Sequence, residues 1–182
     1  MLARRIQRAG IGTPHVYKAS RLHTTTRIMT NMTPQTITLL VNKTDALTFL
    51  RAQQPLPDDD QLSQDLIDAY DAARRLFVAD PDRAALSLFL RSFGNGDGWG
   101  VYPLVEDVFH ACDRSDTVAA IREALEDPTL PGGSRYWVTQ LAAAFADPTL
   151  RAGLALSLRS ERPDTREAAE MALEMLDLHA AR

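Results

Sequence analysis

The sequence has little of what reactive sites and membrane spans require. It contains one cysteine, Cys112, and four histidines among 182 residues. A single cysteine excludes a disulfide within the chain, and so few thiols and imidazoles leave nucleophilic or zinc chemistry without a visible set of residues. Charged residues or glycines interrupt the apolar runs well before the roughly 18 residues of a membrane span. We therefore expect a non-enzymatic, cytoplasmic protein that uses no cofactor or metal and contacts no membrane.

Acidic residues are missing from the first 44 residues, which hold seven basic ones. Residues 45–182 hold the other 13 basic residues and all 24 acidic ones, a net charge of −11 against +7 for the start of the chain. Such a negative field repels the phosphates of nucleic acids and attracts cationic proteins. We expect a basic protein as the partner, and no nucleic acid.

Residues 1–34 are predicted to be a basic, disordered leader, and residues 35–182 to be the folded domain. The first 31 residues are rich in Arg and Thr and lack the apolar core of a secretory signal, which argues against Sec export. The same composition suits a mitochondrial transit peptide. The alternatives are a disordered extension or a start codon placed too far upstream, with Met29 or Met32 as the true first residue.

Amphipathic helical patterns follow one another from Gln64 to the end of the chain, after a short helix within residues 33–54. Residues 64–79 place apolar side chains three and four apart, as in a helix with one buried face. Further helices are predicted after Asp80-Pro81, over 101–112, and after Asp113, Ser134, Asp147-Pro148 and Pro163-Asp164. Aspartate followed by proline starts a helix well, because the carboxylate accepts a free backbone N–H and proline has none to satisfy.

Pairs of these helices recur about every 30–35 residues, a period typical of solenoids built from stacked helical hairpins. No segment alternates strictly enough between apolar and polar residues to predict a sheet. The tetrapeptide DPTL occurs at 127 and again at 147, in different parts of the hairpin, and we interpret it as capping chemistry. The expected fold class is all-α, a short α-solenoid.

Two stretches of the chain resemble HEAT repeats: DRSDTVAAIREALEDPTLPGGSRYWVTQLAAAF and DPTLRAGLALSLRSERPDTREAAEMALEML. Each has an outer helix, a turn with Asp-Pro or its equivalent, and an inner helix that opens with an arginine, Arg135 or Arg166. Residues 45–178 resemble small bacterial HEAT-like proteins, some of which are immunity proteins beside polymorphic toxins. The resemblance implies a HEAT-like domain that neutralises a cationic toxin through an acidic concave face.

Two other functions remain open under the same resemblance. One is a general HEAT-type adaptor that has no toxin as its partner. The other is an alkylpurine DNA glycosylase, since some HEAT-like proteins of that class use Trp and Asp in a basic groove. Trp99, Asp97 and Trp137 offer those residue types, but the acidic body lacks the positive charge that such a groove needs.

The most distinctive local feature is the glycine-rich run GNGDGWG at residues 94–100. No strand precedes it and no lysine follows, which argues against a phosphate-binding loop. A calcium-loop spacing is present at Asn95, Asp97, Gly100 and Glu106, but a tryptophan stands at one of its ligand positions. Two interpretations remain: a plain connector with Trp99 as a lid, or a connector that also presents Trp99 and Tyr102 to a partner.

The predicted partner-binding surface consists of Asp97, Trp99, Tyr102, Glu106, Asp107, Tyr136 and Gln140. If the inner helices line a concave face, the last five of these residues lie on neighbouring ridges of it. Aromatic anchors among acids suit an interface with a basic protein, although a solvated face with two incidental tyrosines would give the same pattern. Trp137 aligns with Ala168 between the two repeats, so we expect it to be buried.

Overall fold

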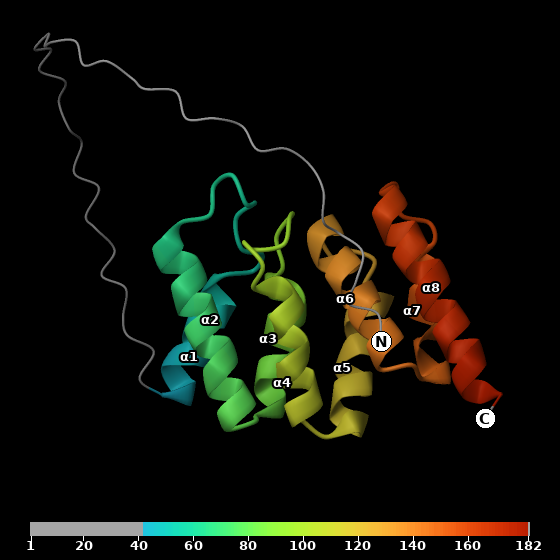
Figure 1. The fold of residues 1–182 in the computed structure, drawn as a ribbon, viewed down its shortest axis with the longest axis horizontal. Helices are drawn as coiled ribbons and strands as arrows, with labels where there is room; N and C mark the ends of the chain where they lie inside the picture. Colours follow the sequence, from blue (N-terminus) through green and yellow to red (C-terminus); the bar gives the residue numbers. More distant parts are fainter. Residues whose placement is uncertain (1–41, 182) are drawn as a thin grey trace, which may run out of the picture. The chain divides into compact units, whose positions relative to one another are not determined.

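The computed structural model describes residues 42–181, and every structural statement below concerns this part of the chain. It forms eight α-helices and two 3₁₀ helices, and it contains no strand (Figure 1). The predicted all-α class is therefore confirmed for these residues. The leader predicted at residues 1–34 lies outside the described part.

The first half comprises α1 (Lys43–Ala52), α2 (Gln64–Ala79), α3 (Arg83–Ser92), the 3₁₀ helix η1 (Tyr102–Val105) and α4 (Glu106–Ala111). Helix α2 spans the predicted residues because Ser63 caps it: its hydroxyl accepts the Leu66 N–H at 3.3 Å. Helix α3 begins later than predicted. Its capping carboxylate belongs to Asp82, which accepts the Ala84 N–H at 2.9 Å, so Asp80-Pro81 precedes the helix.

The second half comprises α5 (Arg114–Glu126), α6 (Gly132–Ala144), the 3₁₀ helix η2 (Pro148–Leu150), α7 (Arg151–Ser157) and α8 (Pro163–Ala180). Both copies of DPTL form the same turn, in which an aspartate accepts the N–H of the threonine two residues later. The distances are 2.8 Å for Asp127 and Thr129 and 2.9 Å for Asp147 and Thr149. The first copy links α5 to α6 without capping α6, whereas in the second copy Asp147 caps η2, so the interpretation as capping chemistry is confirmed for the second copy alone.

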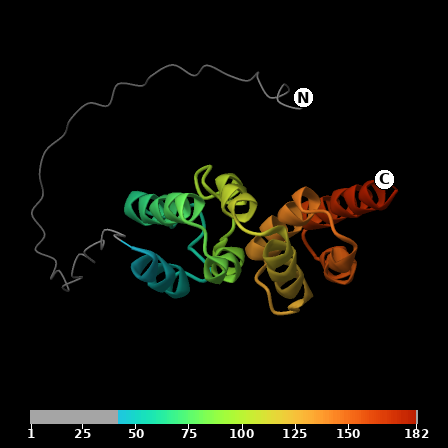
Figure 2. The same cartoon turned by 90° about the horizontal axis from the view of Figure 1, so that it is seen from below.

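The helices contact one another in two rows (Figure 2). In one row, α1 packs on α3, α3 on α5, and α5 on α7; in the other, α2 packs on α4 and α6 on α8. The second row is interrupted in its middle, because the main neighbours of α4 are α2, η1 and α5, whereas those of α6 are α3, α5, α7 and α8. Each of α1, α3, α5 and α7 therefore packs on at least one other helix of its row. In the other row, α2 pairs with α4, and α6 pairs with α8.

The core between the rows changes composition along the chain. In the first half it is aromatic: the Tyr70 ring meets Phe89 edge-on at 5.5 Å and Tyr102 at 5.9 Å, and Phe93 lies 5.3 Å from Tyr102. In the second half, alanines of α6 and α8 are buried instead, among them Ala142, Ala168, Ala169 and Ala172. Small side chains allow α6 and α8 to pack closely along their length.

Polar side chains within this core are hydrogen-bonded. The hydroxyls of Tyr70 and Ser92 lie 2.8 Å apart between α2 and α3, and those of Thr139 and Ser157 lie 2.8 Å apart between α6 and α7. Every buried side-chain nitrogen or oxygen in residues 42–181 has a partner. Buried hydroxyls that are paired in this way cost little and fix how two helices meet.

Candidate functional site

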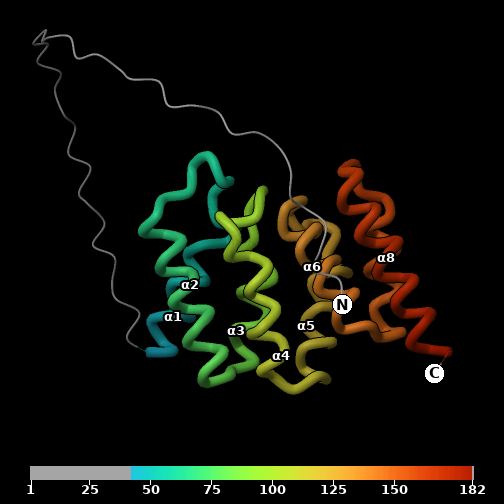
Figure 3. The backbone as a smooth tube through the Cα atoms, viewed as in Figure 1, coloured from blue at the N-terminus to red at the C-terminus, as the bar shows by residue number. Residues whose placement is uncertain are grey.

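Two loops that are far apart in the sequence lie side by side at one end of the helices (Figure 3). One joins α1 to α2 and contains Asp58, Asp59 and Asp60; the other joins α3 to η1 and contains the glycine-rich run. Their backbones meet where the Leu56 N–H donates to the Ser92 carbonyl at 2.8 Å. We call this pair of loops, residues 53–63 and 93–101, the acidic junction.

Two aspartates hold the glycine-rich loop by its backbone. Asp58 Oδ1 accepts both the backbone N–H of Asn95 at 3.1 Å and its side-chain amide at 2.9 Å. The two oxygens of Asp59 accept the N–H groups of Asp97 and Gly98, each at 3.0 Å. Charged acceptors form the stronger class of hydrogen bond, so these carboxylates fix a loop that has no helical or strand hydrogen bonds of its own.

The glycine-rich loop turns through a run of residues with positive φ. Gly96, Gly98 and Gly100 have φ of 101°, 60° and 86°, and Trp99 between them has φ of 52°. Asp97 closes the turn, since its carboxylate accepts the Gly100 N–H at 3.1 Å and its carbonyl accepts the Tyr102 N–H at 3.1 Å. Trp99 is the one residue with a side chain among the positive-φ positions of the described part.

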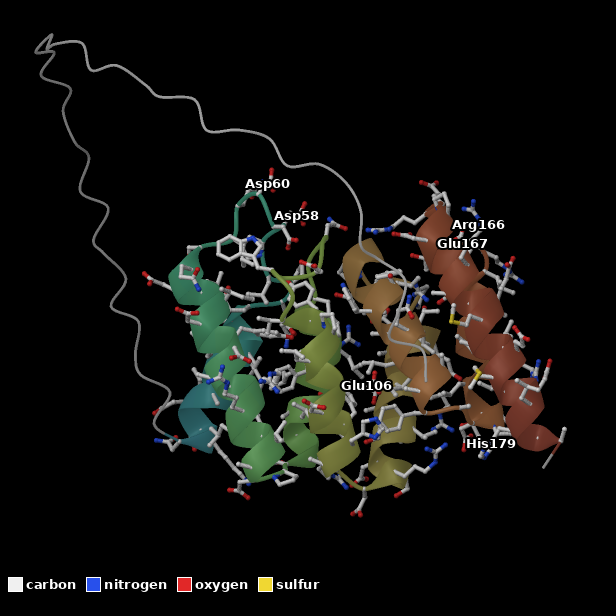
Figure 4. The ribbon with its side chains drawn as sticks, viewed as in Figure 1. Asp58, Asp60, Glu106, Arg166, Glu167 and His179 are labelled. Carbon is white, nitrogen blue, oxygen red and sulfur yellow. The ribbon has the colours of Figure 1, made fainter. Side chains whose placement is uncertain are left out.

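Trp99 is held at its polar edge and open on its apolar surface. The indole N–H donates to the Asp59 carbonyl at 3.2 Å, and 48% of the residue is exposed. Asp97 and Asp60 beside it are also exposed, and Asp58 and Asp60 stand at the outer end of the α1–α2 loop in Figure 4. Exposure of Trp99 and Asp97 is therefore as expected for surface residues, and the structure adds the carboxylates of the preceding loop to their surroundings.

Tyr102 does not belong to this surface. It is 1% exposed, with its ring packed edge-on against Tyr70, Phe93 and Trp137, so the expectation that it faces a partner is wrong. Its hydroxyl oxygen accepts the Gly94 N–H at 3.1 Å. Burial raises the pKa of Tyr102 to about 12, and the negative charges of Asp58, Asp59 and Asp97 act in the same direction. Tyr102 supports the loop from beneath.

The remaining predicted residues lie on two helices of the interrupted row. On α4, Glu106 lies 3.0 Å from His110, and exposed Asp107 lies 3.5 Å from Arg74. On α6, half-buried Tyr136 accepts a hydrogen bond from the Gln140 amide at 3.1 Å, and the Arg162 guanidinium lies 5.9 Å from its ring centroid. Tyr136 therefore contacts Gln140 on α6. Glu106 and Asp107 form a separate pair on α4.

Trp137 is half-buried against the hydrophobic core rather than fully enclosed. Its ring packs against Phe93 and Tyr136 at centroid distances of 6.0 and 5.2 Å, and its indole N–H donates to the Gly96 carbonyl at 3.0 Å. Arg162 in the α7–α8 turn also reaches this loop, donating to the Asn95 side chain at 2.7 Å. The glycine-rich loop is thus held from both halves of the chain.

The contacts of Asp58 and Asp59 could not be found from sequence, because they join residues 37 to 40 positions apart. The local sequence predicts Asp59, Asp60 or Ser63 as the cap of α2, and Ser63 performs this role, which leaves the aspartates free for the glycine-rich loop. No group of three or more His, Cys, Asp or Glu side chains within residues 42–181 is arranged to hold a metal ion. Within the same range, no helix has both the length and the hydropathy to cross a membrane.

Comparison with known proteins gave no match of any kind: no protein-family model, no curated protein and no solved structure matches this chain.

Proposed function

We propose that residues 42–181 form a short α-solenoid of HEAT-like hairpins that binds a basic protein and catalyses no reaction. Equivalent contacts in the last two hairpins support the repeat. Arg135 and Arg166 each lie near the start of the second helix of a hairpin and donate to backbone carbonyls at, or just after, the end of the first helix. The acceptors are Leu125 and Asp127 for Arg135, and Ser160 and Glu161 for Arg166.

The observation that carries the binding role is the way in which Trp99 is held. A residue with a side chain costs about 1–2 kcal/mol in the left-handed region, a cost that glycine would avoid. The neighbouring positions 98 and 100 are glycines, yet position 99 has the largest side chain and leaves 48% of it exposed. Strained backbone in a well-fixed loop is often associated with function, and a rigid, exposed tryptophan is the residue type most enriched at binding hot spots.

The charge around Trp99 supports a cationic partner. Asp58, Asp59, Asp60 and Asp97 lie in the two loops of the acidic junction, and residues 45–182 carry a net charge of −11. Like charges at this density repel an acidic protein and speed the encounter with a basic one. Because Asp58 and Asp59 are fixed by the loop backbone, the field does not depend on flexible side chains.

The particular form of this proposal is an immunity protein that neutralises a cationic toxin domain in the cytoplasm. It is supported by the resemblance of residues 45–178 to small bacterial HEAT-like proteins, some of which are immunity proteins. The surface would extend from Trp99 and Asp97 to the polar residues of α4 and α6, which are Glu106, Asp107, Tyr136 and Gln140. Tyr102 then contributes by supporting the loop and makes no contact with the partner.

The test begins with capture of basic proteins from the native host on immobilised full-length chain, followed by affinity measurements with the purified partner. The key variant is Trp99→Gly, since glycine accommodates φ of 52° and only the ring is lost. We expect Trp99→Gly to weaken binding by about thirtyfold, the hot-spot range. Leu104→Ala, which removes another exposed apolar side chain, is the matched control and leaves the affinity unchanged.

Two further measurements test separately whether binding is electrostatic and whether the partner is a toxin. Raising the salt concentration from about 50 to about 300 mM, which shortens the Debye length about 2.4-fold, reduces the association rate, and Asp60→Lys reduces it further. Co-expression restores growth to cells that the partner alone arrests, whereas the Trp99→Gly variant does not. A partner of acidic charge, salt-independent binding, or full affinity in Trp99→Gly would disprove the proposed site.

A further inference from the structure

The outer side of α8 carries a row of apolar side chains. Met171, Met175 and Leu178 are 55%, 43% and 54% exposed, and they make up half of the six large apolar residues exposed in residues 42–181. Residues spaced four and three apart share one side of a helix. Single exposed apolar residues are ordinary on a protein surface, but a contiguous row of them marks an interaction surface.

A shallow depression adjoins this row. Leu178 lines it together with Leu158 and Leu173, and its remaining lining residues are Glu170, Glu174 and Asp177. The depression therefore combines apolar side chains with carboxylates from one side of α8. A depression lined by apolar side chains and carboxylates can receive a side chain that is apolar along its stem and positive at its end.

Most charged residues of α8 are acidic, and its one arginine binds backbone carbonyls of the preceding turn. The helix contains five acidic residues and one arginine, Arg166, which donates to the Ser160 and Glu161 carbonyls at 2.8 and 2.9 Å. Arg151 of α7 pairs with Asp177. Glu167, near the start of the helix, and His179, near its other end, delimit the surface in Figure 4.

We propose that the outer side of α8 is a docking surface for a basic amphipathic helix of another protein. Anchors at positions i, i+4 and i+7 of such a helix match the spacing of Met171, Met175 and Leu178, and methionine adapts its shape to the side chains that it meets. Lysines beside those anchors would face Glu170 and Glu174. A second copy of α8 would instead bring carboxylates against carboxylates, which is unfavourable.

This proposal is independent of the Trp99 surface, because its residues lie on α8 and its test uses a different probe. The probe is a leucine–lysine peptide of about 14 residues, or four helical turns. A leucine–glutamate peptide with the same leucine spacing is the control. Binding is followed on the full-length chain by NMR of ¹³C-labelled methionine methyl groups, assigned with Met171→Leu and Met175→Leu. We expect the Met171 and Met175 signals to shift with the lysine peptide and not with the glutamate peptide.

Paired variants then separate a specific surface from general attraction to an acidic protein. Met171→Gln with Met175→Gln weakens lysine-peptide binding by about tenfold or more, while Val78→Gln with Leu104→Gln, which are exposed apolar residues elsewhere, has no effect. Glu170→Gln with Glu174→Gln reduces the salt dependence of binding. Equal binding of both peptides, unchanged methyl signals, or methyl shifts that appear on concentrating the protein alone would each overturn the proposal, the last in favour of a dimer.

Discussion

The two halves of the described chain secure the same end of their helices with opposite charges. In the first half, the carboxylates of Asp58 and Asp59 accept backbone N–H groups of the glycine-rich loop. In the second half, the guanidinium groups of Arg135 and Arg166 donate to backbone carbonyls at the C-terminal end of α5 and in the α5–α6 and α7–α8 turns. Backbone that is not in a helix needs a partner of one kind or the other.

This difference explains why carboxylates gather beside the glycine-rich loop. Arginines that bind carbonyls allow the chain to reverse direction within a few residues. Their positive charge is then engaged by the protein's own backbone carbonyls. Asp58 and Asp59, which bind N–H groups in the first half, support long loops, and their negative charge remains beside exposed Trp99. One helical scaffold can thus have a structural end in one half and a candidate binding end in the other.

The largest effect is expected in the first half, from Gly98→Ala. Alanine at φ of 60° costs about 1–2 kcal/mol, and its Cβ would lie 2.5 Å from the buried Tyr102 ring, which adds an overpacking cost of similar size. We expect about 3 kcal/mol of destabilisation in urea unfolding. Gly100→Ala is the matched control, because its φ of 86° is also unfavourable but nothing lies within 4 Å of the new Cβ. Equal losses in both variants would show that the ring gives way.

An intermediate effect is expected in the second half, from Arg135→Met. The substitution keeps much of the buried volume but removes donors to the Leu125 and Asp127 carbonyls, the first of them at 3.1 Å. Hydrogen bonds to charged groups contribute about 1.5–3 kcal/mol, so we expect a loss of about 2 kcal/mol in the free energy of unfolding. Arg159→Met, at an exposed position near the α7–α8 turn, should change stability by less than about 0.5 kcal/mol. If the two variants lose the same stability, arginines do not secure this half.

The smallest effect is a pH dependence at the α5–α6 turn. Hydrogen bonds from the Thr129 hydroxyl and N–H, and then from Arg91, lower the pKa of Asp127 from 3.8 to about 2. A carboxyl group whose pKa is lower in the folded state stabilises the fold above its unfolded pKa, and loses this contribution as pH falls through its folded pKa. Urea midpoints should therefore decline less between pH 4 and pH 2 in Asp127→Asn than in the unsubstituted chain.

Thr129→Val provides the check on this assignment, because it removes the hydroxyl that contributes most to the lowered pKa of Asp127. Its pH profile should fall between those of the unsubstituted chain and Asp127→Asn. Identical profiles for all three proteins would mean that the Asp127 turn contributes nothing to acid stability. Asp147 forms the same turn with Thr149, which likewise lowers the pKa of Asp147, so Asp147→Asn should change the profile in the same direction.

Local chemistry made most of the helices predictable. The apolar periodicity of residues 64–79 predicted α2 with its observed bounds, and Pro163 begins α8 as expected. Helix α6 was predicted to begin at Ser134 but begins at Gly132. Two consecutive glycines usually mark a break, but both lie within α6, and at position 133 a Cβ would lie 2.3 Å from the Gly94 carbonyl oxygen.

The candidate site was harder to predict, because its geometry depends on contacts between distant residues. An aromatic residue next to a glycine-rich loop resembles a surface anchor, and Tyr102 is buried only because Tyr70 and Trp137 come from other helices to cover it. The row on α8 does have a local signal, since Met171, Met175 and Leu178 follow a helical spacing of their own. The alanines on the buried side of α8 form a stronger pattern, and the prediction for this helix was based on them.

The close approach of Gly133 to Gly94 has a mechanical consequence. A Cβ on Gly133 would lie 2.3 Å from the Gly94 carbonyl oxygen, so at this point the two halves meet main chain to main chain. The Ser134 hydroxyl, donating to the Phe93 carbonyl at 2.8 Å, fastens the same seam. Because no side chains separate the two halves at this point, neither half can rotate freely against the other. A ligand bound to Trp99 would therefore meet the resistance of the whole set of helices.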